Sequence, residues 1–129
     1  MKAIQITAFG GPEVMQYTDL PDPVAGESEI VLDVTAVGIN YADTHQTENS
    51  YLSPQTLPMV PGIEVTGTHA GKRYLASVSS GGYAQKAIAH EAALIPIPDA
   101  VTDQQALCML VQGSTAWHLL KTMGSVKAG

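Results

Sequence analysis

Residues 30–39, IVLDVTAVGI, give the clearest strand signal in the chain, because β-branched side chains fill most of these positions. The polar segment 40–61 follows directly, contains Pro54 and Pro58, and shows no sustained apolar period. A long irregular segment inside a compact domain is more often a functional loop than a simple connection. We therefore expect a strand that leads, at Asn40, into a functional loop.

Shorter strands are expected on both sides of this one. Ile4 and Ile6 alternate with Gln5 and Thr7, which is the period of a half-buried strand. The glycines and proline of residues 10–12 then predict a turn. The expected strands are 1–8, 14–18, 63–69, 73–78 and 83–89, with a tight turn at residues 70–71 and an extended segment at 94–98.

The pattern becomes helical after Thr102. Thr102 and Gln105 have the spacing of a capping box, and apolar residues then recur at helical spacing. Gly113 predicts the end of this helix, and Ser114 predicts the cap of a second one. Cys108 lies in the apolar stripe of the first helix, so we expect it in the core.

The composition is that of a globular domain, with 129 residues, 45% hydrophobic and 14% charged, and a formal net charge of −6. The basic pair Lys72-Arg73 is the largest cationic cluster, which argues against a nucleic-acid surface and against docking on anionic membranes. Neither a signal peptide nor a run long enough to span a bilayer is expected. Cys108 is the single cysteine, so no internal disulfide can form, and we expect a cytoplasmic location.

Six strings in a fixed order carry a family resemblance. They are FGGPEVMQY (9–17), AVGINYADTHQ (36–46), LPMVPGIEVTG (57–67), SGGYAQKAIA (80–89), LIPIPDAVTDQQA (94–106) and QGSTAWHLL (112–120). Together they resemble, over essentially the whole chain, the catalytic domain of the medium-chain dehydrogenase/reductase superfamily, in its quinone oxidoreductase (zeta-crystallin-like) branch.

The resemblance implies a mainly β fold. We expect a GroES-like, partly open β-barrel at residues 1–101, followed by two short C-terminal helices at 102–129 that lead to a Rossmann domain. The sequence contains no G-x-G-x-x-G motif, so we expect the Rossmann domain to be absent from this chain. The full-length enzyme would bind NADPH mainly through that missing domain.

The resemblance also bears on metal. Zinc-dependent members of the superfamily carry a ligand cysteine where this chain has Asn40, and a ligand histidine where it has Ile63. Asparagine is a poor zinc ligand, isoleucine has no lone pair, and catalytic zinc needs three side-chain ligands. We therefore expect no metal site and no zinc. Glu64, next to Ile63, is expected to be a buried structural acid.

Without zinc, reduction of a quinone depends on neutral hydrogen-bond donors near the developing oxyanion. Asn40 is the first catalytic candidate, since its amide can donate to a substrate oxygen or to the carboxamide side of the nicotinamide. The alternative is that Asn40 only caps a following turn. In either role we expect Asn40 to be an exposed turn residue that contributes little packing. The resemblance implies that Tyr41 and Asp43 line the same cofactor and substrate cleft.

Four further candidates follow from the resemblance, and three of them carry alternatives. His45 occupies a position where many relatives have tyrosine, and Tyr51 matches a tyrosine that faces substrate; plain loop packing is equally open for both. Thr115 matches a threonine beside the nicotinamide, with helix capping as the alternative. His118 would lie one turn inward, toward the same cleft.

Two functions remain open at this point. The first is the catalytic-domain part of an NADPH-dependent enzyme that acts on quinones or conjugated ketones. The second is a free-standing GroES-like module that binds or assembles without catalysis. Leu119, Leu120 and Met123 are predicted to form an exposed apolar stripe on the last helix, so we also expect a homo-oligomer.

Overall fold

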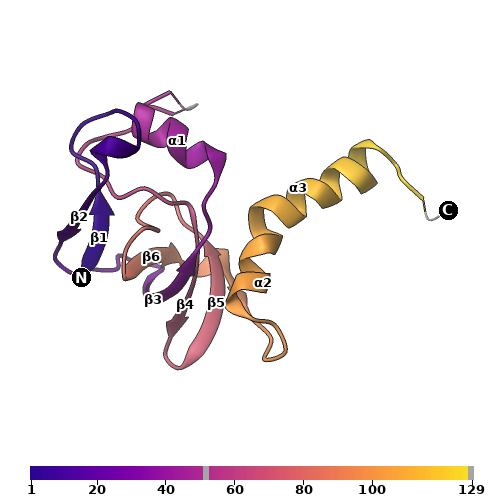
Figure 1. Cartoon of the computed structure of the whole chain (residues 1–129). Coiled ribbons are helices and arrows are strands. Elements are labelled where there is room, and N and C mark those ends of the chain that lie inside the picture. The colour runs from indigo at the N-terminus through magenta and orange to yellow at the C-terminus, as the bar shows by residue number, and fades with distance from the viewer. Residues whose placement is uncertain (51–52, 128–129) are drawn as a thin grey trace.

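The computed structural model describes residues 1–50 and 53–127, and its body is a curled antiparallel sheet (Figure 1). Five strands pair in the order β6-β3-β4-β5-β7, and β1 and β2 form a separate two-stranded sheet. The strands are β1 (Lys2–Gln5), β2 (Gln16–Asp19), β3 (Glu29–Val37), β4 (Glu64–His69), β5 (Lys72–Ser77), β6 (Lys86–His90) and β7 (Leu94–Pro96). The expected mainly β, partly open barrel is confirmed.

Strand β3 lies inside the larger sheet, paired with β4 on one side and β6 on the other. Its Leu32 is fully buried and packs against Val65 of β4, which explains the strong apolar signal of this stretch. Isolated bridges from Ala3 to Ala84 and from Ile6 to Met59 join the first strand segment to the chain that precedes β6 and β4. Ile6 is fully buried there, so the first strand is part of the core.

The expectation of an irregular loop after residue 40 is wrong at its start. Residues Tyr41–Glu48 form helix α1, with Asn40 as its N-cap residue. The helix buries Asp43, Gln46 and Thr47, which are all polar. A helix with a polar buried side has no apolar stripe, and for this reason the periodicity of the sequence does not reveal it.

Helix α2 (Asp103–Cys108) covers the outer face of the larger sheet (Figure 1). Its Ala106 and Leu107 are buried against Leu75 of β5. The Thr102–Gln105 capping box is confirmed, with a 3.2 Å bond from the Gln105 N–H to the Thr102 hydroxyl. These contacts hold the start of the C-terminal helical segment on the barrel.

The two expected C-terminal helices are joined without a break. Gly113 keeps right-handed helical angles (φ −66°, ψ −46°), and π-type turns η3 (Met109–Gly113) and η4 (His118–Met123) flank α3 (Ser114–Trp117). The Ser114 hydroxyl donates back to the Leu110 carbonyl instead of capping a new helix. The resulting continuous helix projects away from the barrel (Figure 1). Within the described ranges, no helix has both the length and the apolar character that crossing a bilayer requires.

The expected place of Cys108 is also wrong. The residue is exposed, not part of the core. The neighbouring residues Ala106 and Leu107 already occupy the side of α2 that faces the sheet, and Cys108 follows them onto a side that does not.

Candidate functional site

The side chain of Asn40 is held at both ends by hydrogen bonds. Its Nδ2 donates to Glu64 Oε1 at 3.0 Å, and its Oδ1 accepts from Gln112 Nε2 at 2.8 Å. The three residues come from the N-cap of α1, from β4 and from the C-terminal helix. Asn40 is only 7% exposed, so the expectation of an exposed turn residue is wrong. Its side chain joins three separate segments of the chain.

Glu64, the acid of this group, is almost fully buried, with 1% of its surface exposed. One oxygen accepts from Asn40, and Oε2 has no hydrogen-bond partner among the described residues. The carboxylate fits because Gly38 lies against it: a Cβ built on Gly38 would be 2.0 Å from Glu64 Oε1. Glu64 is therefore a buried acid, as expected, and the glycine of the AVGIN string makes its position possible.

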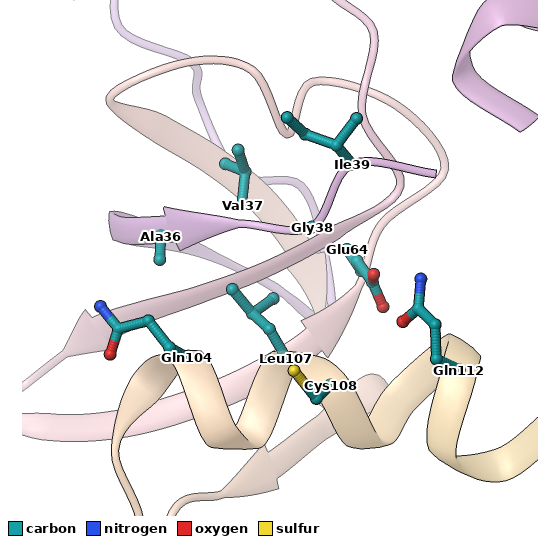
Figure 2. A pocket seen from close by; sticks show the side chains of 9 residues that line it. All are labelled: Ala36, Val37, Gly38, Ile39, Glu64, Gln104, Leu107, Cys108 and Gln112. Carbon is teal, nitrogen blue, oxygen red and sulfur yellow. The ribbon is translucent and has the colours of Figure 1, made fainter. Parts of the chain in front are cut away.

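A pocket of about 320 Å³ opens beside this group, between the end of β3 and the helix that covers the sheet. Figure 2 shows the Glu64 carboxylate and the Gln112 amide pointing toward one another at one end. The other lining residues are Ala36, Val37, Gly38, Ile39, Gln104, Leu107 and Cys108. Most of these residues are apolar; Glu64 and Gln112 supply polar groups at one end, and Gln104 supplies an amide at the other (Figure 2).

The cap of α1 adds a second buried carboxylate. Asp43 is 2% exposed, and its Oδ2 accepts from the Asn40 N–H at 2.8 Å and from the Tyr83 hydroxyl at 2.6 Å. Burial of the ring, and then the bond to Asp43, raise the pKa of Tyr83 well above its ordinary value. Asp43 thereby fixes the backbone of Asn40 and ties it to the loop before β6.

Replacing Tyr83 by phenylalanine is expected to change how stability depends on alkaline pH. Because the folded pKa of Tyr83 is raised, its contribution to stability is complete below pH 10 and is lost as pH rises further. Urea unfolding at about pH 8 and about pH 10.5 measures this loss. Tyr83→Phe should be less stable than the parent at the lower pH and should decline less between the two. An identical decline in both proteins would contradict the assignment.

The remaining candidates on α1 lie at its surface. Tyr41 is 80% exposed, and its ring meets that of His45 edge to face, with centroids 4.9 Å apart. His45 Nδ1 lies 2.8 Å from the Ser50 hydroxyl. Tyr51 lies outside the described residues. Tyr41 and His45 therefore extend from the same helix that Asn40 begins.

The candidates on the C-terminal helix lie beyond its contact with the barrel. Thr115 is exposed on α3, one turn after Gln112. His118 is also exposed, and its Nδ1 lies 3.2 Å from the Thr122 hydroxyl four residues on. Asn40 and Asp43 thus meet in the cap of α1 and Gln112 reaches Asn40, whereas Thr115 and His118 lie further along the helix with no described contact to this group.

Two residues of the site have no assigned role in the sequence argument. Gln112 and Tyr83 both lie in strings that carry the family resemblance, QGSTAWHLL and SGGYAQKAIA. Each forms its bond to a residue at least 40 positions away. Sequence spacing alone does not place such partners, although their presence in these strings is a usable signal.

The described part of the chain contains no set of three or more His, Cys, Asp or Glu residues arranged to hold a metal ion. At the two positions singled out above, Asn40 is engaged with Glu64 and Gln112, and Ile63 has no lone pair.

Comparisons with known proteins find a matching family model and similar proteins. Residues 26–71 match the family model of the alcohol dehydrogenase GroES-like domain. The quinone oxidoreductase of Lama guanicoe is 31% identical, covering 100% of this chain and 43% of that protein. The solved quinone oxidoreductase of Thermus thermophilus, studied also as its complex with NADPH, is 37% identical with a TM-score of 0.89, covering 100% of this chain and 43% of that one. The Escherichia coli quinone oxidoreductase complexed with NADPH is 28% identical with a TM-score of 0.84, covering 95% and 41%.

The fold and these matches indicate the class: the chain has a GroES-like fold, and its residues 26–71 match the alcohol dehydrogenase GroES-like domain. Within that class it is similar to the N-terminal part of quinone oxidoreductases, which confirms the predicted resemblance to that branch of the medium-chain dehydrogenase/reductase superfamily. The chain spans about 43% of the length of the curated quinone oxidoreductases from Lama guanicoe and Homo sapiens.

Proposed function

We propose that this chain is the catalytic-domain part of an NADPH-dependent oxidoreductase that reduces quinones or conjugated ketones without zinc. The single observation that supports this most directly is the Asn40 amide. It is buried and oriented by two partners, Glu64 and Gln112, which both line a pocket near the end of β3. Similarity to quinone oxidoreductases solved with NADPH supports the choice of cofactor and substrate class.

The residues present fit one end of a nicotinamide. An asparagine amide carries two N–H groups, and Glu64 takes one of them; in the proposed role the second donates to the nicotinamide or to the substrate oxygen. The Thr115 hydroxyl is exposed one turn beyond Gln112 and is the second proposed contact. NADPH supplies the hydride when bound. Asn40 and Thr115 would orient the nicotinamide or the substrate oxygen, with Tyr41, His45, Tyr51 and His118 as the surrounding candidates.

Zinc independence is proposed from the chemistry of the side chains. A carbonyl that is reduced needs stabilisation of the charge that develops on its oxygen, and a preorganised N–H supplies it as a Lewis acid would. Quinones are strong electrophiles and need less of this help than simple ketones. Asn40 offers such a donor where the zinc-dependent members carry a ligand cysteine.

The proposal predicts that the protein holds no stoichiometric zinc. Elemental analysis of protein purified without added metal measures this directly. A zinc-dependent alcohol dehydrogenase carried through the same purification is the control for loss of metal. One zinc per chain that survives dialysis would contradict the zinc-free assignment.

The activity is tested with the longest product that the gene encodes, alongside the 129-residue chain. Calorimetric titration is expected to show NADPH binding to a product that includes a nucleotide-binding domain, and little or none to this chain alone. NADPH oxidation by a quinone should follow the binding, and Asn40→Ala should lower turnover roughly tenfold. Binding without any quinone or enone reduction would favour the alternative, a non-catalytic binding module.

Two accompanying expectations belong to this proposal. A cytoplasmic location is proposed because the lone cysteine is exposed and unpaired by any disulfide. A homo-oligomer is proposed because Leu119, Leu120 and Met123 are 60%, 54% and 78% exposed on the projecting helix.

A further inference from the structure

The amide of Asn40 has two ends of nearly equal shape, so its partners decide which end faces which direction. Glu64, as a carboxylate, only accepts hydrogen bonds, and therefore attracts the NH₂ end. Gln112 donates its Nε2 proton to the opposite end, the Oδ1. The three side chains form one directed chain of bonds, from Gln112 to Asn40 to Glu64.

This direction is fixed by Glu64 and completed by Gln112. If Gln112 presented its carbonyl oxygen instead, Asn40 would have to turn and place its own oxygen against the Glu64 carboxylate. Both atoms would then be acceptors without a proton between them, at a site where Glu64 is 1% exposed and Asn40 is 7% exposed. Only the observed arrangement satisfies both ends of Asn40.

We infer that Gln112 is a positioning residue: its donation to Asn40 Oδ1 from the C-terminal helix fixes, together with Glu64, the amide whose second N–H is offered to a bound acceptor. The inference rests on the proposed function for the identity of that acceptor. The positioning itself rests only on the observed bonds. It makes the orientation of Asn40 depend on where the C-terminal helix lies.

The positioning is tested by substituting Gln112 with side chains that differ in hydrogen-bonding character. Gln112→Ala removes the donor, Gln112→Lys keeps a donor without an acceptor, and Gln112→Glu replaces the donor with an acceptor. Gln104→Ala is the matched control, since Gln104 lies on the same helical segment and lines the same pocket. If Gln112 only helped the helix to pack, Gln112→Lys would not restore the behaviour that Gln112→Ala loses.

The readout is the exchange of the Asn40 side-chain amide protons with solvent, measured by NMR on the 129-residue chain. Selective labelling with ¹⁵N-asparagine is sharp here because the sequence contains two asparagines, Asn40 and Asn49. Substitution of Asn49 assigns the two signals. Gln112→Ala should accelerate exchange at Asn40 about two- to tenfold, the factor that corresponds to one lost hydrogen bond. Gln112→Glu should accelerate it further, and Gln112→Lys and Gln104→Ala should match the parent.

Turnover in the longer gene product gives the second readout. Turnover should be lower in Gln112→Ala than in the parent, and lowest in Gln112→Glu. Unchanged exchange in Gln112→Ala, or failure of lysine to restore it, would overturn the positioning role. If the enzyme is active but its turnover does not differ among the Gln112 variants as expected, the Asn40 amide is not used in the reaction. A parent protein that does not reduce quinones with NADPH would defeat the proposed function alone, since the exchange result is independent of it.

Discussion

Asn40→Asp is expected to destabilise the fold by about 3–5 kcal/mol at neutral pH, the cost typical of an uncompensated buried charge. The new carboxylate would face Glu64 Oε1 at the place where the Asn40 amide now donates at 3.0 Å. It would also keep the bond from Gln112 while losing every donor of its own. Two carboxylates in one buried site repel each other, so the effect is electrostatic and not one of shape.

Asn40→Ala provides the comparison, because it removes the same bonds without adding a charge. Its cost should be about 1–3 kcal/mol, from the partners left without hydrogen bonds. Urea unfolding at pH 7 measures both variants, and repetition near pH 4 separates their causes, since a shared proton relieves the repulsion only in the aspartate variant. If aspartate and alanine are equally destabilising at both pH values, the contact with Glu64 is not the one described.

Gly67→Ala is expected to weaken the centre of the sheet by about 3 kcal/mol, at the upper end of typical overpacking costs. A Cβ on Gly67 would be 2.7 Å from the Asp33 carbonyl oxygen and 3.2 Å from the Asp33 carbonyl carbon. Both atoms belong to the backbone of β3, which pairs with β4 at this point, so no side chain can move aside. The two strands would have to separate locally.

Gly26→Ala is the matched control for this variant. A Cβ there would meet only the flexible Glu29 carboxylate, at 3.1 Å, in an exposed loop. Its effect should stay within about 0.5 kcal/mol. Chemical denaturation of the two variants and the parent measures the difference, and equal stability of the two would show that β3 and β4 tolerate the added methyl group.

The sequence predicts the strands well because their alternation and their glycine turns depend on neighbouring residues. The hairpin of β4 and β5, with its turn at Ala70-Gly71, is an example, and so is the capping box at Thr102. The predicted end of a helix at Gly113 rests on the same local grounds and is wrong. Glycine permits a helix to stop but does not require it, and here the helix continues with ordinary angles.

Helix α1 and the site network could not be derived from local pattern. The sequence of the helix has no apolar period, because the side chains it buries are polar: Asp43, Gln46 and Thr47. In the network, Asn40 is joined to Glu64 across 24 positions and to Gln112 across 72. Asn40 itself could be singled out from the family resemblance. Its partners depend on how the helix after the barrel packs on the sheet, which only the fold determines.

The projecting helix has a further consequence for how stability is distributed. Its first turns are anchored by Ala106 and Leu107, whereas Trp117, Leu120 and Met123 are each more than half exposed. An unsupported helix of a few turns is marginal in water, because its own hydrogen bonds barely offset the entropy of ordering it. The distal turns should therefore open far more often than the barrel, and any surface that binds their apolar side chains would draw its affinity from folding them. Recognition there would be coupled to helix formation, with Gln112 at the boundary between the anchored and the opening half.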